Sequence, residues 1–462
     1  MNIKTIYALS TFYGQSSVAV VRVSGSESLM VAKKICNLQN IKPRYANFCK
    51  LIDRKGKVFD EGLVIYFKKP NSFTGEDVLE IQTHGSIIVI NKLLEELSKL
   101  KNLVPAKPGE FSKRSFLNNK QNLMYFEGIN NLIAAESENQ IDIAKRQVFG
   151  FKKNPTLKWK NTIQEIKAII NANIEFSEDF DDKNNASNLK RKIKKIKTEI
   201  QKSISLSNSV EKIKHGHKII LLGPVNTGKS SLINFLFQDN KSITSKYKGT
   251  TTDQIEYSLS LRGEKVTFVD SAGIRHSKRF IEKEGIKKTM SNLNSDNNFI
   301  LVLSPEILSN ANLKSIDRLI LRIIKKRFII VLNKTDLSNS KLRFDNFKKK
   351  YPQIPDSKYI EISCKEQSLD LKKLKSFQLF VYQKLLKTNM NTNDDVYFSE
   401  LRHYQCLESI NSKLNLALDH IEEIEIVSNF LDEALHELDN IFGRHDKEEE
   451  LDIIFRKFCI GK

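Results

Sequence analysis

One stretch, GPVNTGKSS at residues 223–231, restricts the fold of this chain more than any other. It follows the apolar run HKIILL and runs into SLINFLF, an order that indicates a buried strand, a glycine-rich loop and a helix. Gly223 and Gly228 let the backbone N–H groups of such a loop turn inward on phosphate oxygens. Lys229 neutralises phosphate charge and the Ser230 hydroxyl reaches a magnesium ion. The stretch therefore predicts a nucleoside triphosphate site beside a parallel sheet.

The apolar runs that follow predict the rest of this sheet. KVTFVD, NFILVL and RFIIVLN read as buried strands, each followed by a helical segment, which predicts a doubly wound, Ras-like domain over 213–385. Helical patterns fill 119–212 and 386–462, so we expect one discontinuous helical domain into which this α/β domain is inserted. Residues 1–118 combine short β-rich runs with an amphipathic helix at 86–100, and predict a separate α+β domain.

Three further motifs predict that the nucleotide is GTP. In NKTD at 333–336, Asp336 can accept the two donors of a guanine edge, and an adenine edge offers no such pair. SCK at 363–365 supplies a loop beside the base, and DSAG at 270–273 ends a strand where magnesium and the γ-phosphate are expected. These motifs, with Thr251 of GTTTD, assign nucleotide contacts to Gly223, Asn226, Thr227, Gly228, Lys229, Ser230, Ser231, Thr251, Asp270, Ser271, Ala272, Gly273, Asn333, Lys334, Asp336, Ser363, Cys364 and Lys365.

Two details distinguish this site from that of Ras. Ile274 occupies the position where Ras-type enzymes have the glutamine that orients water, so an acidic residue further on, Glu282 or Glu284, is expected to serve. No arginine finger is evident in the sequence. A monovalent cation held near Asn226 and the loop before Thr250 can supply the same charge.

Charge and composition leave two interpretations of the surface open. The net charge of +20 fits a polyanionic partner, but lysine is abundant throughout the chain, including on the amphipathic helix expected at 189–204. Five scattered cysteines indicate neither a disulfide framework nor a zinc site. With no signal-peptide pattern and no apolar run of membrane-spanning length, we expect a cytoplasmic protein that does not enter a membrane.

Several quoted segments together resemble one family. PNSFTGEDVLEIQTHG at 70–85, PGEFSKRSFLNNK at 108–120, IEFSED at 174–179 and the terminal FCIGK, joined to the GTP motifs, resemble the MnmE/TrmE family of tRNA-modification GTPases. The resemblance covers essentially the whole chain. Such GTPases form homodimers whose GTP-binding domains meet when GTP and potassium are bound. By this resemblance Ser230 and Thr251 hold Mg²⁺, Glu282 positions or activates water, Ser245 and Thr250 join the GTP site, and the potassium ligands are Asn226, Ser245, Tyr247 and Thr250.

The resemblance also implies a folate site and a modification reaction. The family installs a carboxymethylaminomethyl or aminomethyl group at C5 of the wobble uridine of certain tRNAs. It acts with a flavin-dependent partner of the MnmG/GidA type, in a heterotetramer. The carbon donor is 5,10-methylenetetrahydrofolate, for which 5-formyltetrahydrofolate is an analogue. The folate contacts match Arg22, Glu80, Lys120 and Lys462, and Cys459 is either a nucleophile or proton carrier, or a structural residue.

The chain departs from the family pattern at several positions of the N-terminal and GTP-binding domains. The N-terminal loop reads FYGQSS at 12–17 without the family's arginine and two of its glycines, and Ser86 and Thr252 replace a glycine and an arginine. A ribosome-assembly or RNA-binding GTPase without one-carbon chemistry is the alternative. No two glycines are three residues apart, so the G-x-x-G loop of a KH domain is missing from the sequence.

Overall fold

The computed structural model describes residues 4–150, 153–175, 182–237, 245–248, 255–270, 298–308, 313–365, 371–386, 397–444, 448–458 and 461. These residues form two compact units. The first comprises Met1–Ile133, Gln147–Ile200 and Gln405–Lys462, and the second comprises Ala134–Arg146 and Gln201–Tyr404. None of the helices among the described residues combines the length and the apolarity that a membrane span requires.

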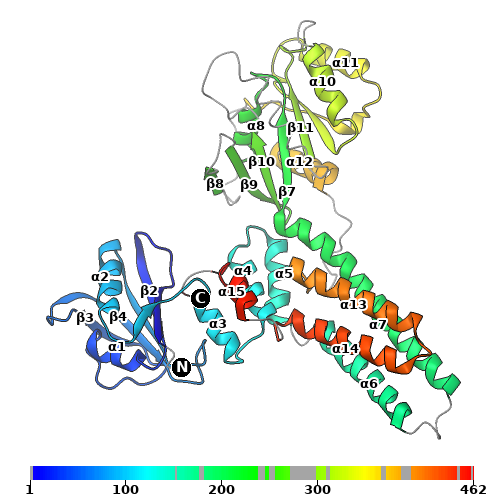
Figure 1. Ribbon diagram of the computed structural model, residues 1–462. Helices are drawn as coiled ribbons and strands as arrows, with labels where there is room; N and C mark the ends of the chain where they lie inside the picture. The colour runs from blue at the N-terminus through cyan, green and yellow to red at the C-terminus, as the bar shows by residue number, and fades with distance from the viewer. Residues whose placement is uncertain are drawn as a thin grey trace. The chain divides into compact units, whose positions relative to one another are not determined.

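The first unit begins with a six-stranded sheet of order β3-β4-β5-β2-β1-β6 (Figure 1). Its strands are β1 (Thr5–Leu9), β2 (Ser16–Ser24), β3 (Asn47–Ile52), β4 (Val58–Phe67), β5 (Val78–Gly85) and β6 (Leu103–Pro105). Strand β6 runs parallel to β1, and the other neighbours are antiparallel. Side chains alternate along β2 and β5, and one face packs on α1 (Ser28–Lys34) and α2 (Ile87–Ser98) to form the core.

The rest of this unit is helical. It contains α3 (Glu110–Leu117), α4 (Leu123–Ile133), α6 (Pro155–Glu175), α14 (Ile424–Ile441) and α15 (Glu448–Phe455), whereas α5 (Glu138–Phe149), α7 (Asp182–His215) and α13 (Leu401–Asp419) each belong partly to it and partly to the second unit. Ion pairs Lys160–Asp439 and Lys167–Asp432 join α6 to α14. The predicted apolar stripe of α7 is confirmed at Ile193, Ile196 and Ile200, which are buried, whereas its fourth predicted residue, Ile204, is half-buried. Lys194 and Lys195, between the buried positions, are exposed.

The second unit contains the predicted doubly wound domain. Its seven-stranded sheet has the order β13-β12-β11-β7-β10-β9-β8 (Figure 1). The strands are β7 (His217–Leu222), β8 (Ser245–Lys248), β9 (Ile255–Leu261), β10 (Glu264–Asp270), β11 (Asn298–Leu303), β12 (Phe328–Leu332) and β13 (Tyr359–Glu361). Strands β10, β7, β11, β12 and β13 are parallel neighbours, and β9 runs antiparallel to both β10 and β8.

Helices cover both faces of this sheet. One apolar cluster packs α8 (Lys229–Leu236) and α12 (Leu371–Val381) against the strands, and a second packs α10 (Leu313–Ile323) and α11 (Ser340–Lys350) against the other face. Two short helical turns, Asp356–Lys358 and Tyr382–Leu386, precede β13 and follow α12. The predicted fold class is confirmed: an N-terminal α+β domain, a helical domain, and a Ras-like α/β domain, hereafter the G domain, inserted within the helices.

Candidate functional site

The loop between β7 and α8 has the backbone that a phosphate-binding loop requires. Gly223 and Gly228 have φ of 143° and 90°, values that favour glycine. Neither site has room for a side chain, because a Cβ on Gly223 would lie 2.3 Å from the carbonyl oxygen of Val302, and one on Gly228 would lie 2.2 Å from Nδ2 of Asn333. The loop is thus shaped by its two glycines, and its last residue opens the N-terminus of α8, where backbone N–H groups favour an anion.

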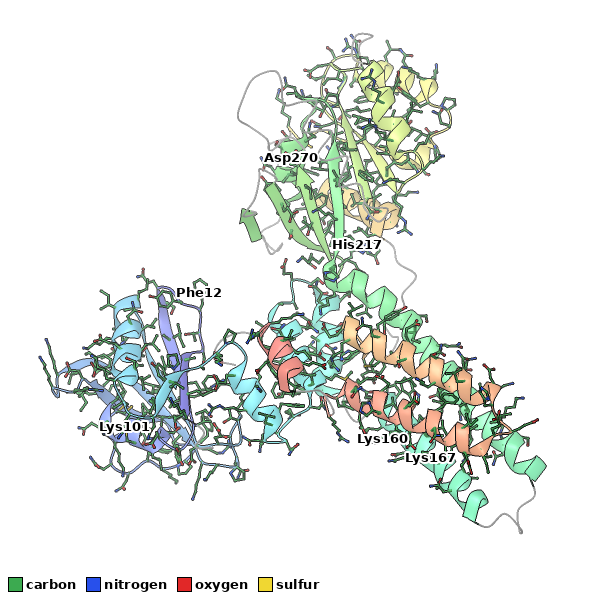
Figure 2. All side chains as sticks on the ribbon, in the orientation of Figure 1. Phe12, Lys101, Lys160, Lys167, His217 and Asp270 are labelled. Atoms are coloured by element: carbon green, nitrogen blue, oxygen red, sulfur yellow. The ribbon has the colours of Figure 1, made fainter. Side chains whose placement is uncertain are left out.

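Lys229 and Ser230 carry the charged and hydroxyl groups of this loop. Lys229 is buried, and its Nζ donates to the carbonyl oxygens of Gly223 and Pro224 at 2.7 and 2.8 Å, so the ammonium lies across the mouth of the loop. The Ser230 hydroxyl donates to a carboxylate oxygen of Asp270 at 3.3 Å. Figure 2 shows Asp270 at the end of β10. A hydroxyl beside a carboxylate is an oxygen donor set that suits Mg²⁺.

The predicted guanine-recognition residues converge at the same edge of the sheet. The Asn333 side chain donates to the carbonyl oxygen of Thr227 at 3.0 Å and accepts from the Cys364 N–H at 3.3 Å, so it joins the phosphate loop to the SCK loop. The Ser363 hydroxyl donates to Asp336 at 2.6 Å. This bond is the main cause that holds the pKa of Asp336 below its usual value, and the carboxylate therefore stays ionised as an acceptor for guanine N–H groups.

The remaining residues of this edge add two findings. Burial, with a smaller effect of the nearby Asp336, raises the pKa of the Cys364 thiol to about 12, so it is no nucleophile. Lys334 has a positive φ of 63°, and its Nζ pairs with Glu306 at 2.7 Å. Glu306 was not predicted from the sequence, because it comes shortly after β11 and belongs to none of the four GTP motifs.

Several predicted site residues, or their side chains, lie outside the part of the chain that the structure describes. The side chains of Ser245 and Tyr247, on β8, are not described. Outside the described residues lie Thr250, Thr251, Ser271, Ala272, Gly273, Glu282, Cys459 and Lys462. Of the other loop residues, Thr227 is buried and its hydroxyl donates to the Pro224 carbonyl at 3.0 Å, whereas Asn226 and Ser231 are exposed. The Lys365 N–H donates to the Ser363 hydroxyl at 3.4 Å.

A second constellation lies on the face of the N-terminal sheet opposite the α1–α2 core. Arg22 on β2 and Glu80 on β5 are register partners, and Nε and one terminal nitrogen of the guanidinium both donate to Oε1 of Glu80, at 2.9 and 2.7 Å. Within the described residues the other carboxylate oxygen of Glu80 accepts no hydrogen bond. The guanidinium also lies over the rings of Phe73 and Phe111, with centroid distances of 5.6 and 6.0 Å.

The end of the chain contacts this pair. The carbonyl oxygen of Gly461 accepts from Arg22 at 2.9 Å and from the Ser10 hydroxyl at 3.0 Å. Gly461 is buried with a φ of 87°, and a Cβ there would lie 2.7 Å from the Leu9 carbonyl oxygen. Gly461 of the tail FCIGK is therefore held on the N-terminal sheet. Ser10 shares in this contact and was not predicted from the sequence.

Helix α15 fixes where the tail begins. A Cβ on Gly109 would lie 2.1 Å from the Phe455 carbonyl oxygen, and Lys113 pairs with Asp452 at 2.7 Å. The Lys113 bond is the main cause that lowers the pKa of Asp452. Predicted Lys120 lies between α3 and α4 and reaches the loop before β5, where its Nζ donates to the Pro70 carbonyl at 2.8 Å and its stem lies near Gly75. The structure thus joins Arg22 and Glu80 directly and places Lys120 on a neighbouring loop.

Comparison with known proteins identifies the family of the chain. Residues 5–120 match the family model of the GTP-binding protein TrmE N-terminus, and residues 123–459 match that of the MnmE helical domain. The tRNA modification GTPase MnmE of Aliarcobacter butzleri is 34% identical over 461 residues, covering 99% of both chains. That of Ehrlichia chaffeensis is 36% identical over 465 residues, covering 99% of this chain and 100% of the relative. That of Campylobacter concisus is 34% identical over 462 residues, with the same coverage. Full-length similarity at this level shows that the chain belongs to the MnmE family of tRNA modification GTPases.

Proposed function

We propose that this GTPase installs a carboxymethylaminomethyl or aminomethyl group at C5 of the wobble uridine of certain tRNAs, with potassium, a tetrahydrofolate carbon donor and a flavin-dependent partner of the MnmG/GidA type. GTP hydrolysis with Mg²⁺ and a role in tRNA modification follow from family membership. The finer chemistry rests on how this chain arranges its own residues. In this proposal 1–118 binds folate and dimerises, 119–212 with 386–462 forms the helical domain, and 213–385 hydrolyses GTP.

The observation that carries the proposal is the contact of the chain's end with the Arg22–Glu80 pair. Arg22 and Glu80 are 58 positions apart in the sequence, and Gly461 is 439 positions from Arg22, yet all three meet on one face of the sheet. In the sequence, Lys462 directly follows the buried Gly461, and Cys459 precedes it by two residues. A purely structural tail needs no such ion pair, because apolar packing of Phe455 already anchors α15.

The residues of this face suit a reduced folate. Two guanidinium nitrogens of Arg22 donate to Oε1 of Glu80 and orient the carboxylate, so its second oxygen can accept N–H groups of a pterin edge. Lys120 and Lys462 supply positive charge for the glutamate end of the ligand, and Arg22 holds Glu80 at the pterin end. A bound tetrahydrofolate supplies the one-carbon unit. In this proposal Lys462, three residues after Cys459 in the sequence, favours the thiolate form of Cys459, which can then accept or donate a proton near that carbon.

Potassium and water activation concern the G domain. Asn226 lies in the phosphate loop with a left-handed φ of 64°, and β8 carries Ser245 and Tyr247 along one edge of the sheet. We propose that these three residues and Thr250 ligate potassium, and that the ion supplies the charge of an arginine finger when two G domains of a homodimer meet. Ser230 and Thr251 would hold Mg²⁺, and Glu282 would position the attacking water.

Calorimetry with 5-formyltetrahydrofolate tests the folate step. The full-length chain should bind, and Glu80→Gln should weaken binding by about 10- to 100-fold, because a hydrogen bond to a charged group contributes about 1.5–3 kcal/mol. Glu61→Gln is the matched control. It makes the same change on the exposed part of neighbouring β4 and should bind as the unmodified chain does. Removal of residues 459–462 should abolish binding.

The opposite result separates the two candidate functions. If the folded, GTP-hydrolysing chain binds no reduced folate, the one-carbon chemistry is wrong, and a GTPase that acts on RNA by binding alone takes its place. Mass spectrometry of tRNA nucleosides after incubation with the flavin-dependent partner gives an independent readout. The modified uridine should appear with the intact chain and be missing with Glu80→Gln.

A further inference from the structure

The G domain contains a hairpin that links its nucleotide site to helix α5. Strand β10 ends at Asp270, which accepts the Ser230 hydroxyl, and its register partner there is Ile255, the first residue of β9. Thr251 of the magnesium site lies just before β9 in the sequence, and DSAG begins at the last residue of β10. Both segments expected to contact the γ-phosphate and magnesium are therefore attached to one end of the β9–β10 hairpin.

The other end of the hairpin is a tight turn. Arg262 and Gly263 connect the strands and have φ of 53° and 83°, a pair of positive values typical of a two-residue hairpin turn. Figure 2 shows His217 and Asp270 at opposite ends of the central strands, and the register pairs Val266, near the turn, with His217. The turn thus lies at the end of the sheet away from the phosphates.

The first residues of α5 hold this turn through three polar contacts. The backbone N–H of Asn139 donates to the Gly263 carbonyl at 3.1 Å, and its side-chain amide donates to Glu264 at 3.1 Å. Just before the helix, Glu136 accepts from Nζ of Lys265 at 3.0 Å. The fit is close, because a Cβ on Gly263 would lie 2.8 Å from Oδ1 of Asn139.

The contact between the turn and α5 includes a buried carboxylate, that of Glu264. Glu264 is buried, and its second oxygen has no hydrogen-bond partner among the described residues; Nε2 of His217 lies 3.7 Å from that oxygen. The Asn139 amide is therefore the donor that satisfies this buried carboxylate. Hydrogen bonds depend strongly on distance and angle, whereas apolar contacts do not. A shift of the turn would therefore change its hydrogen bonds with α5.

Helix α5 also has the connections needed to carry such a shift. Gln140 donates to the carbonyl oxygens of Ile213 and Lys214 at 3.2 and 2.9 Å, which joins α5 to the end of α7. The boundary between the two compact units falls within α5, after Arg146. Beyond that boundary, Gln147 accepts from Asn131 of α4 at 3.0 Å. One continuous helix thus contacts the hairpin turn at its start and the helical domain at its end.

We propose that α5 senses the nucleotide state of the G domain through the β9–β10 turn, with Asn139 and Glu136 as the positioning residues that couple GTP hydrolysis to the helical domain. The proposal rests on the proposed function, in which nucleotide turnover drives modification. It adds the physical connection between the GTP site and the rest of the chain. The two ends of a hairpin move together because its strands are held by a continuous ladder of backbone hydrogen bonds.

Hydrogen exchange of the full-length chain tests the coupling without folate or RNA, so its failure is distinguishable from failure of the modification chemistry. Amides of 123–149 are compared in GDP and in GDP with aluminium fluoride, both with Mg²⁺ and K⁺. Exchange should differ by about fivefold or more between the two states, the lower range of allosteric coupling. Asn139→Ala and Glu136→Gln should abolish this difference while GTP hydrolysis stays within about twofold of the unmodified rate.

Glu138→Gln is the matched control, since Glu138 is exposed, lies two residues from Glu136, and makes no hydrogen bond or ion pair with the turn in the part of the chain that the structure describes. It should keep the nucleotide-dependent difference. Exchanging the charges, with Glu136→Lys and Lys265→Glu together, should restore the difference that either change alone removes. The proposal is overturned if unmodified 123–149 exchanges equally in both states. It is also overturned if Asn139→Ala raises exchange equally in both states and keeps their ratio, which indicates a stabilising role only.

Discussion

Gly228 of the phosphate loop and Asn333 of the guanine motif are in direct contact, and a Cβ on the glycine would lie 2.2 Å from Nδ2 of the asparagine. That same amide donates to the Thr227 carbonyl at 3.0 Å. The loop expected to bind the phosphates and the loop expected to bind the base thus contact each other directly.

Gly228→Ala should therefore abolish nucleotide binding while the fold persists. The residue has a φ of 90°, where a side chain is strained, and the new methyl group would displace Asn333. Binding of a fluorescent GDP analogue should fall by more than about 100-fold, as expected when about 3 kcal/mol of interactions are lost. Unaltered circular dichroism is the control, and tight binding by the variant would show that the loop relaxes without cost.

Asp336→Asn should change the base preference of the site from guanine to xanthine. The ionised carboxylate, kept so by the Ser363 hydroxyl, accepts two guanine donors, and an amide presents a donor where one acceptor stood. Affinity for GTP should fall by about 100-fold or more, and xanthosine triphosphate should bind better than GTP. Competition between the two nucleotides measures this. Ser363→Ala should leave the base preference unchanged and raise the pKa of Asp336.

His84 should titrate above the usual histidine range. Its Nδ1 lies 2.7 Å from Asp60, and this hydrogen bond is the main cause that raises its pKa. Because the folded-state pKa exceeds the unfolded value of about 6.5, the stabilising contribution is complete below that pH and is lost as pH rises through the folded pKa. NMR of the ring protons should show the raised midpoint, and Asp60→Asn should lower it. An unchanged midpoint in the variant would exclude Asp60 as the cause.

Local sequence patterns predicted the G domain well, and long-range register explains what they missed. GPVNTGKSS specified a strand, a loop and a helix, and the structure has β7 ending at Leu222 and α8 beginning at Lys229. The pairing of Arg22 with Glu80 depends on the register of β2 against β5, which no local pattern encodes. Glu306 escaped notice for a related reason, because it meets Lys334 only when β11 and β12 lie side by side.

The hydrophobic anchor of the tail was equally invisible in the sequence. Phe455 is fully buried against Phe126 and Phe116, with ring centroids 6.0 Å apart in both pairs, and these rings come from α4 and α3, more than three hundred residues earlier. Amphipathic periodicity indicates that a helix has an apolar face, but it does not name the partner of that face. The family resemblance placed FCIGK near the N-terminal domain, and the packing of α15 gives the physical reason.

Phe455→Ala should consequently release the tail before it unfolds the chain. Removal of a buried aromatic ring costs about 3–5 kcal/mol, and here the loss falls on the short α15, which Lys113–Asp452 alone cannot hold, since a partly exposed ion pair contributes about 1 kcal/mol or less. Limited proteolysis should cleave the variant within 448–458, a segment protected in the unmodified chain. GTP hydrolysis should be unchanged, because the G-domain core shares no residue with this cluster. Lys113→Ala, which removes the ion pair with Asp452, should leave the tail protected; rapid cleavage of that variant would instead assign the anchoring to charge.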